Sequence, residues 1–202
     1  MRTVTVAGHG AATAPADAAD VRVAIVHHAD SVTTAVAGVD EAGRQARTVA
    51  VEVTAEDAVS QTDFSVWPRH DHEGRPSGYE ARHSLTIRCA DLATAGRLVS
   101  ALADRLDHRL VVEQVSPVIA DPGPVEDQAR VAAFEDATRR ATHLVGLAGE
   151  GLDLVQTIVE GAPAHHVPMA EAAASRDSLD LSFGGSQLTV AVSLTVTFAL
   201  AM

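Results

Sequence analysis

The sequence predicts an α+β protein in which helices pack on antiparallel or mixed β-sheets. Several segments have an apolar residue at every second position, which is the pattern of a strand with one buried face. Between them lie segments whose apolar residues recur every three or four positions, as in an amphipathic helix. The predicted order of elements is β-β-α-β-β-α-β-α-β-β. Six consecutive elements within it have the split β-α-β-β-α-β order of ferredoxin-like sandwiches.

In the first half of the chain, these patterns predict two pairs of strands with a helix between them. The predicted ranges are strands at 3–8 and 21–28, a helix at 32–54, a strand around 64–66 and a strand at 79–89. Ser31 stands where its hydroxyl can accept a hydrogen bond from the first amides of the helix. Residues 10–20 are expected to form a connection. Pro68 is expected to end the strand before it, and residues 69–78 are expected to form a loop.

In the second half, the same patterns predict two helices and three strands. The predicted ranges are a helix at 92–106, a strand at 109–119, a helix at 125–147, and strands at 152–160 and 188–200, with an irregular segment at 161–185. Asp91 stands at the N-cap of the first of these helices. The last strand is more than twice as long as the usual strand of about 5–6 residues. It could therefore either pair with another subunit or lie wholly within one sheet.

The length of 202 residues fits a single domain that spans residues 1–202. Within this domain, the split-order core at 21–120 and the long helix with the closing strands at 121–202 are two candidate sub-lobes. A chain of this length buries about 70% of its unfolded surface, so it needs no disulfide or metal to hold its fold.

Composition and charge argue against several classes of function. The chain has 15 basic and 27 acidic side chains, a net charge of −12, and only 3% aromatic residues. A negative surface repels phosphate backbones and few rings can stack on bases, so we expect no nucleic-acid partner. No apolar stretch approaches the ~18 residues of a membrane span, and no signal-peptide core follows Met1. We therefore expect a cytoplasmic protein without a transmembrane segment.

No residue pattern in the chain indicates an enzyme or a cofactor. Gly8-x-Gly10 lacks the third glycine of a dinucleotide fingerprint, so these two glycines are expected only to ease the end of a strand. Cys89 continues the apolar face of its strand and is expected to be buried and inert. A serine nucleophile has no Gly-x-Ser-x-Gly elbow. We predict no catalytic residue and no cofactor, and an enzyme assembled from scattered residues ranks last among the hypotheses.

The stretch 70–73, His-Asp-His-Glu, is the candidate metal site. On an extended segment, His70 and His72 point the same way, as two ligands of zinc or another transition metal ion must. A closed site needs about four ligands, and the two histidines at 165–166 are the obvious partners. The alternative is a loop that is simply solvated.

Six short motifs follow one another along nearly the whole chain. They are Gly8-His9-Gly10, Pro15 to Val21, Val59 to Pro68, Gly78-Tyr79-Glu80-Ala81, the alanine-rich helix from Ala129 to Leu147 with its following glycines, and the alternating segment from Gly185 to Leu200. In this order they resemble the motifs of the SIMPL-domain family, named for a signalling molecule associated with a mouse pelle-like kinase. The resemblance implies an α+β fold, homo-oligomers in at least some members, and proposed links to oxidative stress or signalling. It implies no agreed enzymatic activity and supplies no catalytic residues.

The residues and the resemblance together lead to a first hypothesis of a non-enzymatic, self-associating scaffold or stress-related interaction module, with a homo-oligomer as its working form. The alternative is a metal- or small-ligand-binding protein that uses the His70 and His72 loop.

Overall fold

The computed structural model describes residues 2–161, 164–168 and 187–201. These residues form two compact units. Residues 17–118 make up the first, which we call the insert unit. The remaining described residues make up the second, which we call the terminal unit because it contains the first and the last strand of the chain.

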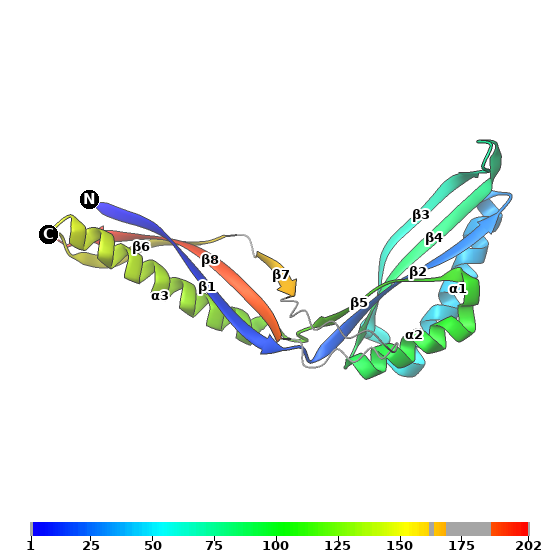
Figure 1. The fold of residues 1–202 in the computed structure, drawn as a ribbon, viewed down its shortest axis with the longest axis horizontal. Helices are drawn as coiled ribbons and strands as arrows, with labels where there is room; N and C mark the ends of the chain where they lie inside the picture. Colours follow the sequence, from blue (N-terminus) through cyan, green and yellow to red (C-terminus); the bar gives the residue numbers. More distant parts are fainter. Residues whose placement is uncertain (1, 162–163, 169–186, 202) are drawn as a thin grey trace, which may run out of the picture. The chain divides into compact units, whose positions relative to one another are not determined.

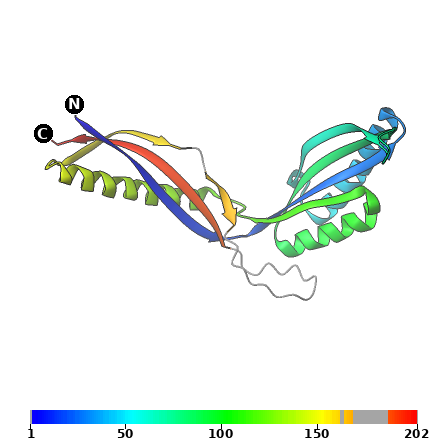
Figure 2. The same ribbon diagram turned by 45° about the horizontal axis from the view of Figure 1, so that its top comes forward.

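The insert unit is an antiparallel sheet with two helices on one face (Figures 1 and 2). Its elements are β2 (Ala18–Ala29), α1 (Val32–Val53), β3 (Val59–His70), β4 (Pro76–Cys89), α2 (Leu92–Leu106) and β5 (Leu110–Val118), with short 3₁₀ turns at Glu56–Ala58 and Asp107–Arg109. The strand order is β3-β4-β2-β5, so β3 and β5 are the edge strands. The core lies between the sheet and the helices, where Val21, Val23 and Ile25 of β2 and Leu98 and Leu102 of α2 are fully buried.

Both helices of the insert unit begin at the caps that the sequence predicts. The hydroxyl of Ser31 accepts a hydrogen bond from the backbone N–H of Thr34 at 3.2 Å. The carboxylate of Asp91 accepts one from the backbone N–H of Thr94 at 2.6 Å. These bonds satisfy amide donors that the first turn of a helix leaves without a backbone partner.

The terminal unit is a second antiparallel sheet with one long helix along one face (Figure 1). Its elements are β1 (Thr3–Pro15), α3 (Gly123–Leu147), β6 (Leu152–Glu160), β7 (Ala164–Pro168) and β8 (Gln187–Leu200). The strand order is β1-β8-β6, and β7 also pairs with β8. The apolar face of β8, which includes Val192, Leu194, Val196 and Phe198, is buried with the alanines of α3.

The structure confirms the predicted fold class and element order. The closing strand β8 pairs with β1 along residues 187–199 and with β6 and β7 on its other edge. Because both edges of β8 are occupied, this long strand lies within its own sheet. That arrangement is the second of the two alternatives that its length left open.

Several boundary predictions were wrong, and the ends of β1 and β3 have a clear physical reason. Strand β1 continues to Pro15 because β8 provides a partner for every residue from Thr3 onward. Strand β3 continues through Pro68 because β3 is an edge strand, where a missing N–H interrupts no ladder. The segment expected to be irregular at 161–185 contains the short strand β7, and residues 169–186 lie outside the described part of the chain.

None of the helices in the described part of the chain is long and apolar enough to cross a membrane. The cytoplasmic location and the lack of a nucleic-acid partner stay predictions.

Candidate interaction surface

The candidate metal loop lies at the tip of the β3–β4 hairpin. His70 is the last residue of β3, and His72 lies in the turn with 88% of its side chain exposed. The Asp71 carboxylate between them accepts hydrogen bonds from the backbone N–H groups of Arg75 and Glu73, both at 2.9 Å. These bonds, first that of Arg75, hold the pKa of Asp71 below its ordinary range. The Asp71 carboxylate therefore stabilises the turn through these hydrogen bonds.

The described side chains bring no third ligand to His70 and His72. Among them, no group of three or more His, Cys, Asp or Glu residues is placed to hold a metal ion. The side chains of His165 and His166, the expected partner ligands, lie outside the described residues. Metal binding stays a prediction, and elemental analysis of protein purified without a histidine tag checks it directly.

The groove between α1 and α2, about 570 Å³ in volume, is lined by several ionisable side chains, and two of them, Glu41 and Arg44, are paired with each other. The guanidinium of Arg44 donates a hydrogen bond to the carboxylate of Glu41 at 2.6 Å. This bond lowers the pKa of Glu41 from its ordinary value. General acid–base catalysis requires a pKa near the operating pH, and the pKa of Glu41 is shifted away from that range. Glu41 and Arg44 therefore form a surface ion pair.

Cys89 is fully buried at the end of β4, as predicted. Burial raises the pKa of its thiol, and the carboxylates of Asp20 and Asp91 raise it further. A reactive cysteine requires a lowered pKa and access to solvent. Cys89 is therefore a packing residue.

The Gly8-x-Gly10 motif lies in the middle of β1, where α3 approaches the strand. A Cβ atom on Gly8 would overlap the carbonyl oxygen of Ala133 and lie 2.7 Å from the Cβ of Ala137. A Cβ atom on Gly10 would overlap the carbonyl oxygen of Ala129. The two glycines therefore permit close contact between helix and strand backbones, instead of easing a strand end.

A carboxylate on α3 accepts a hydrogen bond from a backbone N–H group of β1. Asp136 is only 8% exposed, and its Oδ2 accepts a hydrogen bond from the backbone N–H of His9 at 3.1 Å. That bond is the main reason why the pKa of Asp136 lies below its ordinary range. Side-chain contacts of this kind restrict the pairing of an edge strand with another chain. The β1 edge of the terminal sheet is thus partly blocked.

The opposite edge of the terminal sheet is apolar and exposed. It is formed by β6, which pairs only with β8 among the described strands. Four large apolar side chains of β6 are exposed, and we call them the β6 edge patch: Leu154 (72%), Val155 (38%), Ile158 (53%) and Val159 (55%). An edge strand with apolar side chains and unpaired backbone groups is a template for pairing with another chain.

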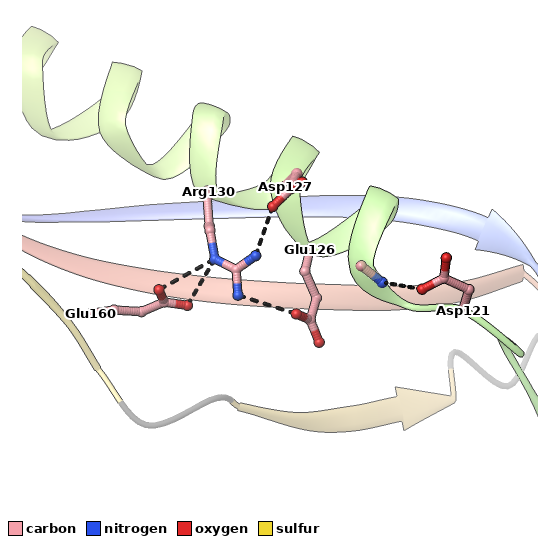
Figure 3. A network of polar contacts seen from close by, with 6 residues as sticks. Asp121, Glu126, Asp127, Arg130 and Glu160 are labelled. Carbon is pink, nitrogen blue, oxygen red and sulfur yellow. Dashed lines mark hydrogen bonds and ion pairs between the residues drawn. The ribbon is translucent and has the colours of Figure 1, made fainter.

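A charged cluster joins α3 to Glu160, the last residue of β6 (Figure 3). The Nε of Arg130, on α3, donates to both carboxylate oxygens of Glu160 at 3.1 and 3.2 Å. The same guanidinium donates to Asp127 at 2.8 Å and to Glu126 at 3.1 Å, and the Asp127 bond contributes most to raising the pKa of Arg130. Just before this turn of α3, Asp121 accepts a hydrogen bond from the backbone N–H of Gly123. Arg130 thereby connects the end of β6 to the helix.

The model of one protein family matches residues 4–198 of this chain, which is nearly its whole length. The chain belongs to the SIMPL family. This family is described as one of proteins of unknown function (DUF541), a description that names no enzymatic activity. A comparison with curated proteins found no match.

The glycines of two of the SIMPL motifs found in the sequence serve the fold. Gly8 and Gly10 permit the contact between α3 and β1, and Gly78 at the start of the return strand β4 has a φ of +96°. A Cβ atom on Gly78 would lie 2.5 Å from the carbonyl oxygen of Ala29. These glycines are therefore required by close backbone contacts and, at Gly78, by a left-handed backbone conformation.

Sequence reasoning placed a strand at 152–160 but did not identify its exposed residues. The signal was present as two apolar pairs, Leu154-Val155 and Ile158-Val159, separated by Gln156-Thr157. Such pairs do not alternate strictly and so place apolar residues on both faces of a strand. In an edge strand, at least some of them must then be exposed.

Proposed function

We propose that this SIMPL protein is a non-enzymatic interaction module that works by associating with copies of itself. The observation that supports self-association most strongly is the β6 edge patch, which combines four exposed large side chains with a strand edge that no described strand pairs. Full burial of one such side chain contributes about 1.5–3 kcal/mol. Because the four side chains are partly buried already, each contributes less than this amount, and together they favour association.

The two edges of the terminal sheet support the choice of β6. The β1 edge carries no exposed large apolar side chain among its described residues, and one of its N–H groups is bound by Asp136. The β6 edge carries the whole β6 edge patch. Pairing at β6 would bury apolar surface, whereas pairing at β1 would have to displace a carboxylate.

A scaffold role fits the paired or buried state of the ionisable groups described above. Glu41 and Arg44 bind each other, Asp136 binds the backbone of β1 and the guanidinium of Arg140 at 2.8 Å, and Cys89 is buried. The link to stress responses rests on the family resemblance alone.

Sedimentation equilibrium of the wild type and of Ile158→Lys tests the proposal. The lysine places a strongly hydrated charge in the centre of the β6 edge patch, so we expect the dissociation constant to rise at least tenfold. Leu147→Lys is the matched control, because Leu147 is 74% exposed at the end of α3 and lies outside the patch. Equal association of all three proteins would contradict a role for β6.

A further inference from the structure

We infer that two copies of the chain pair their β6 strands antiparallel about a two-fold axis that passes between Gln156 and Thr157. This inference rests on the proposed function and specifies its partner surface. In this register, Gln156 of one copy lies opposite Thr157 of the other, and the remaining residues pair outward from this point. Leu154 then faces Val159 of the second copy, and Val155 faces Ile158. Every member of the β6 edge patch meets another member, as an isologous interface requires.

An irregularity in β6 makes this register consistent with the two faces of the sheet. Val155 pairs with Phe198 and Ile158 pairs with Val196, and both of these β8 residues are buried with α3. The register of β6 against β8 shifts twice, once between Leu152 and Val155 and once between Val155 and Thr157, and the second shift leaves Gln156 as an extra residue.

Because of this extra residue, Val155 and Ile158 share a face although they are three positions apart, and Thr157 and Val159 share the other. Opposed residues of an antiparallel pair lie on the same face. Shifting the proposed register by one residue would oppose Val155 to a residue of the other face. The proposed register keeps Val155 opposite Ile158 on the helix-covered face.

The charged cluster at Arg130 reduces a charge repulsion that arises at both ends of the paired β6 strands. Asp153 of one copy would stand opposite Glu160 of the other, and like charges that are directly opposed destabilise a strand pair. Arg130 binds both carboxylate oxygens of Glu160. The guanidinium therefore offsets part of this repulsion at each end of the two-fold interface.

Disulfide trapping reads the register directly. Gln156→Cys and Thr157→Cys proteins are oxidised separately and as an equal mixture, and the covalent dimers are identified by mass. We expect the mixed dimer, which joins one copy of each variant, to exceed both self-linked dimers by at least fivefold. The native Cys89 does not interfere because it is fully buried.

Each alternative outcome has a distinct meaning. A dominant Gln156→Cys or Thr157→Cys self-linked dimer would show a register shifted by one residue and would overturn the inference while leaving self-association intact. A dimer in solution without any of these disulfides would place the interface elsewhere and would also overturn it. A monomer without disulfides would overturn the proposed function itself.

Arg130→Gln tests the role assigned to the charged cluster. We expect the dissociation constant to rise about two- to fivefold at low ionic strength, the scale of an exposed ion pair. Added salt should reduce this difference because it screens the repulsion between Asp153 and Glu160. Arg44→Gln is the matched control, since Arg44 also binds acidic residues three and four positions earlier on a helix but lies in the insert unit. An equal effect of both substitutions would contradict the assignment.

Discussion

Two glycines show how the same residue type serves opposite roles in this chain. Gly8 lies on β1 where a Cβ atom would overlap the backbone of α3. Gly96 lies in the middle of α2, where a Cβ atom would meet nothing within 4 Å. A helix-interior glycine costs helix stability, because its backbone loses more conformational freedom on folding than that of alanine. Packing therefore requires glycine at position 8 but not at position 96.

Substituting alanine at each position should change stability in opposite directions. We expect Gly96→Ala to raise the free energy of unfolding by about 1 kcal/mol. Gly8→Ala should lower it by about 1–3 kcal/mol, because the helix has to move away from the strand. Urea denaturation of the two variants measures both effects. Destabilisation by Gly96→Ala, or a neutral Gly8→Ala, would contradict this account of the packing.

His83 is a half-buried titratable residue between the sheet and α1. Its ring lies edge-on to that of Phe64 with a centroid distance of 6.0 Å, and its Nδ1 lies 3.0 Å from the position that a Cβ on Gly43 would occupy. Burial lowers the pKa of His83, while Asp40 acts in the opposite direction and Arg47 in the same direction. The neutral ring is thus the form that fits between β4 and α1.

The lowered pKa of His83 predicts that acid destabilises the fold. The unfolded chain binds a proton at this histidine near its ordinary pKa of about 6.5, whereas the folded chain binds it at lower pH. Stability should therefore fall as the pH drops below about 6.5 towards the folded pKa. The loss of unfolding free energy between pH 7 and pH 5.5 should be larger for the wild type than for His83→Gln. The same loss in both proteins would show that His83 does not contribute.

At the scale of elements, local patterns predicted the order of strands and helices. Each strand or helix has its own apolar periodicity, and the helices of the insert unit also have their own N-caps. Ser31 and Asp91 are examples, since each cap bond joins residues three positions apart. Features that depend on distant partners could not be predicted in this way. The length of β1 depends on β8, Pro68 is tolerated because β3 is an edge strand, and the exposure of β6 depends on which strands flank it.

The helix caps make a quantitative prediction for α1. Ser31→Ala removes the acceptor for the backbone N–H of Thr34 and should lower the free energy of unfolding by about 1 kcal/mol. Ser31→Asp is the control and should retain most of the stability, because aspartate is an equally good N-cap residue. A denaturation midpoint in Ser31→Ala equal to that of the wild type would contradict the role of this cap.

The candidate site was less predictable than the fold. The loop with His70 and His72 is a candidate metal site from sequence because imidazoles are common metal ligands. The described side chains, however, add no third ligand to it. The β6 edge patch consists of ordinary apolar residues, which sequence reasoning assigns to a core by default. Only the strand order shows that Ile158 and its neighbours lie at an edge.

At the scale of the whole molecule, the two units differ in how far apart in sequence their contacts lie. In the terminal unit, Thr3 pairs with Ala199, so β1 and β8 meet only after nearly the whole chain is made. In the insert unit, β3 and β4 form a hairpin between neighbouring segments. Contacts between distant residues form slowly because they close long loops.

This difference predicts the order of folding of the two units. The amides of the insert unit should become protected before those of the terminal unit when refolding is followed by pulsed hydrogen exchange. Earlier protection of β1 and β8 than of β3 and β4 would contradict it.

Self-association of the whole protein is opposed by the net charge of −12 and favoured by the β6 edge patch. The most direct measurement is the mass of the wild-type protein in solution, determined by light scattering after size-exclusion chromatography at micromolar concentration. Self-association through β6 predicts a mass of at least twice the 21.0 kDa of one chain, and Ile158→Lys should reduce it to the mass of a single chain. A strictly monomeric wild type would contradict it.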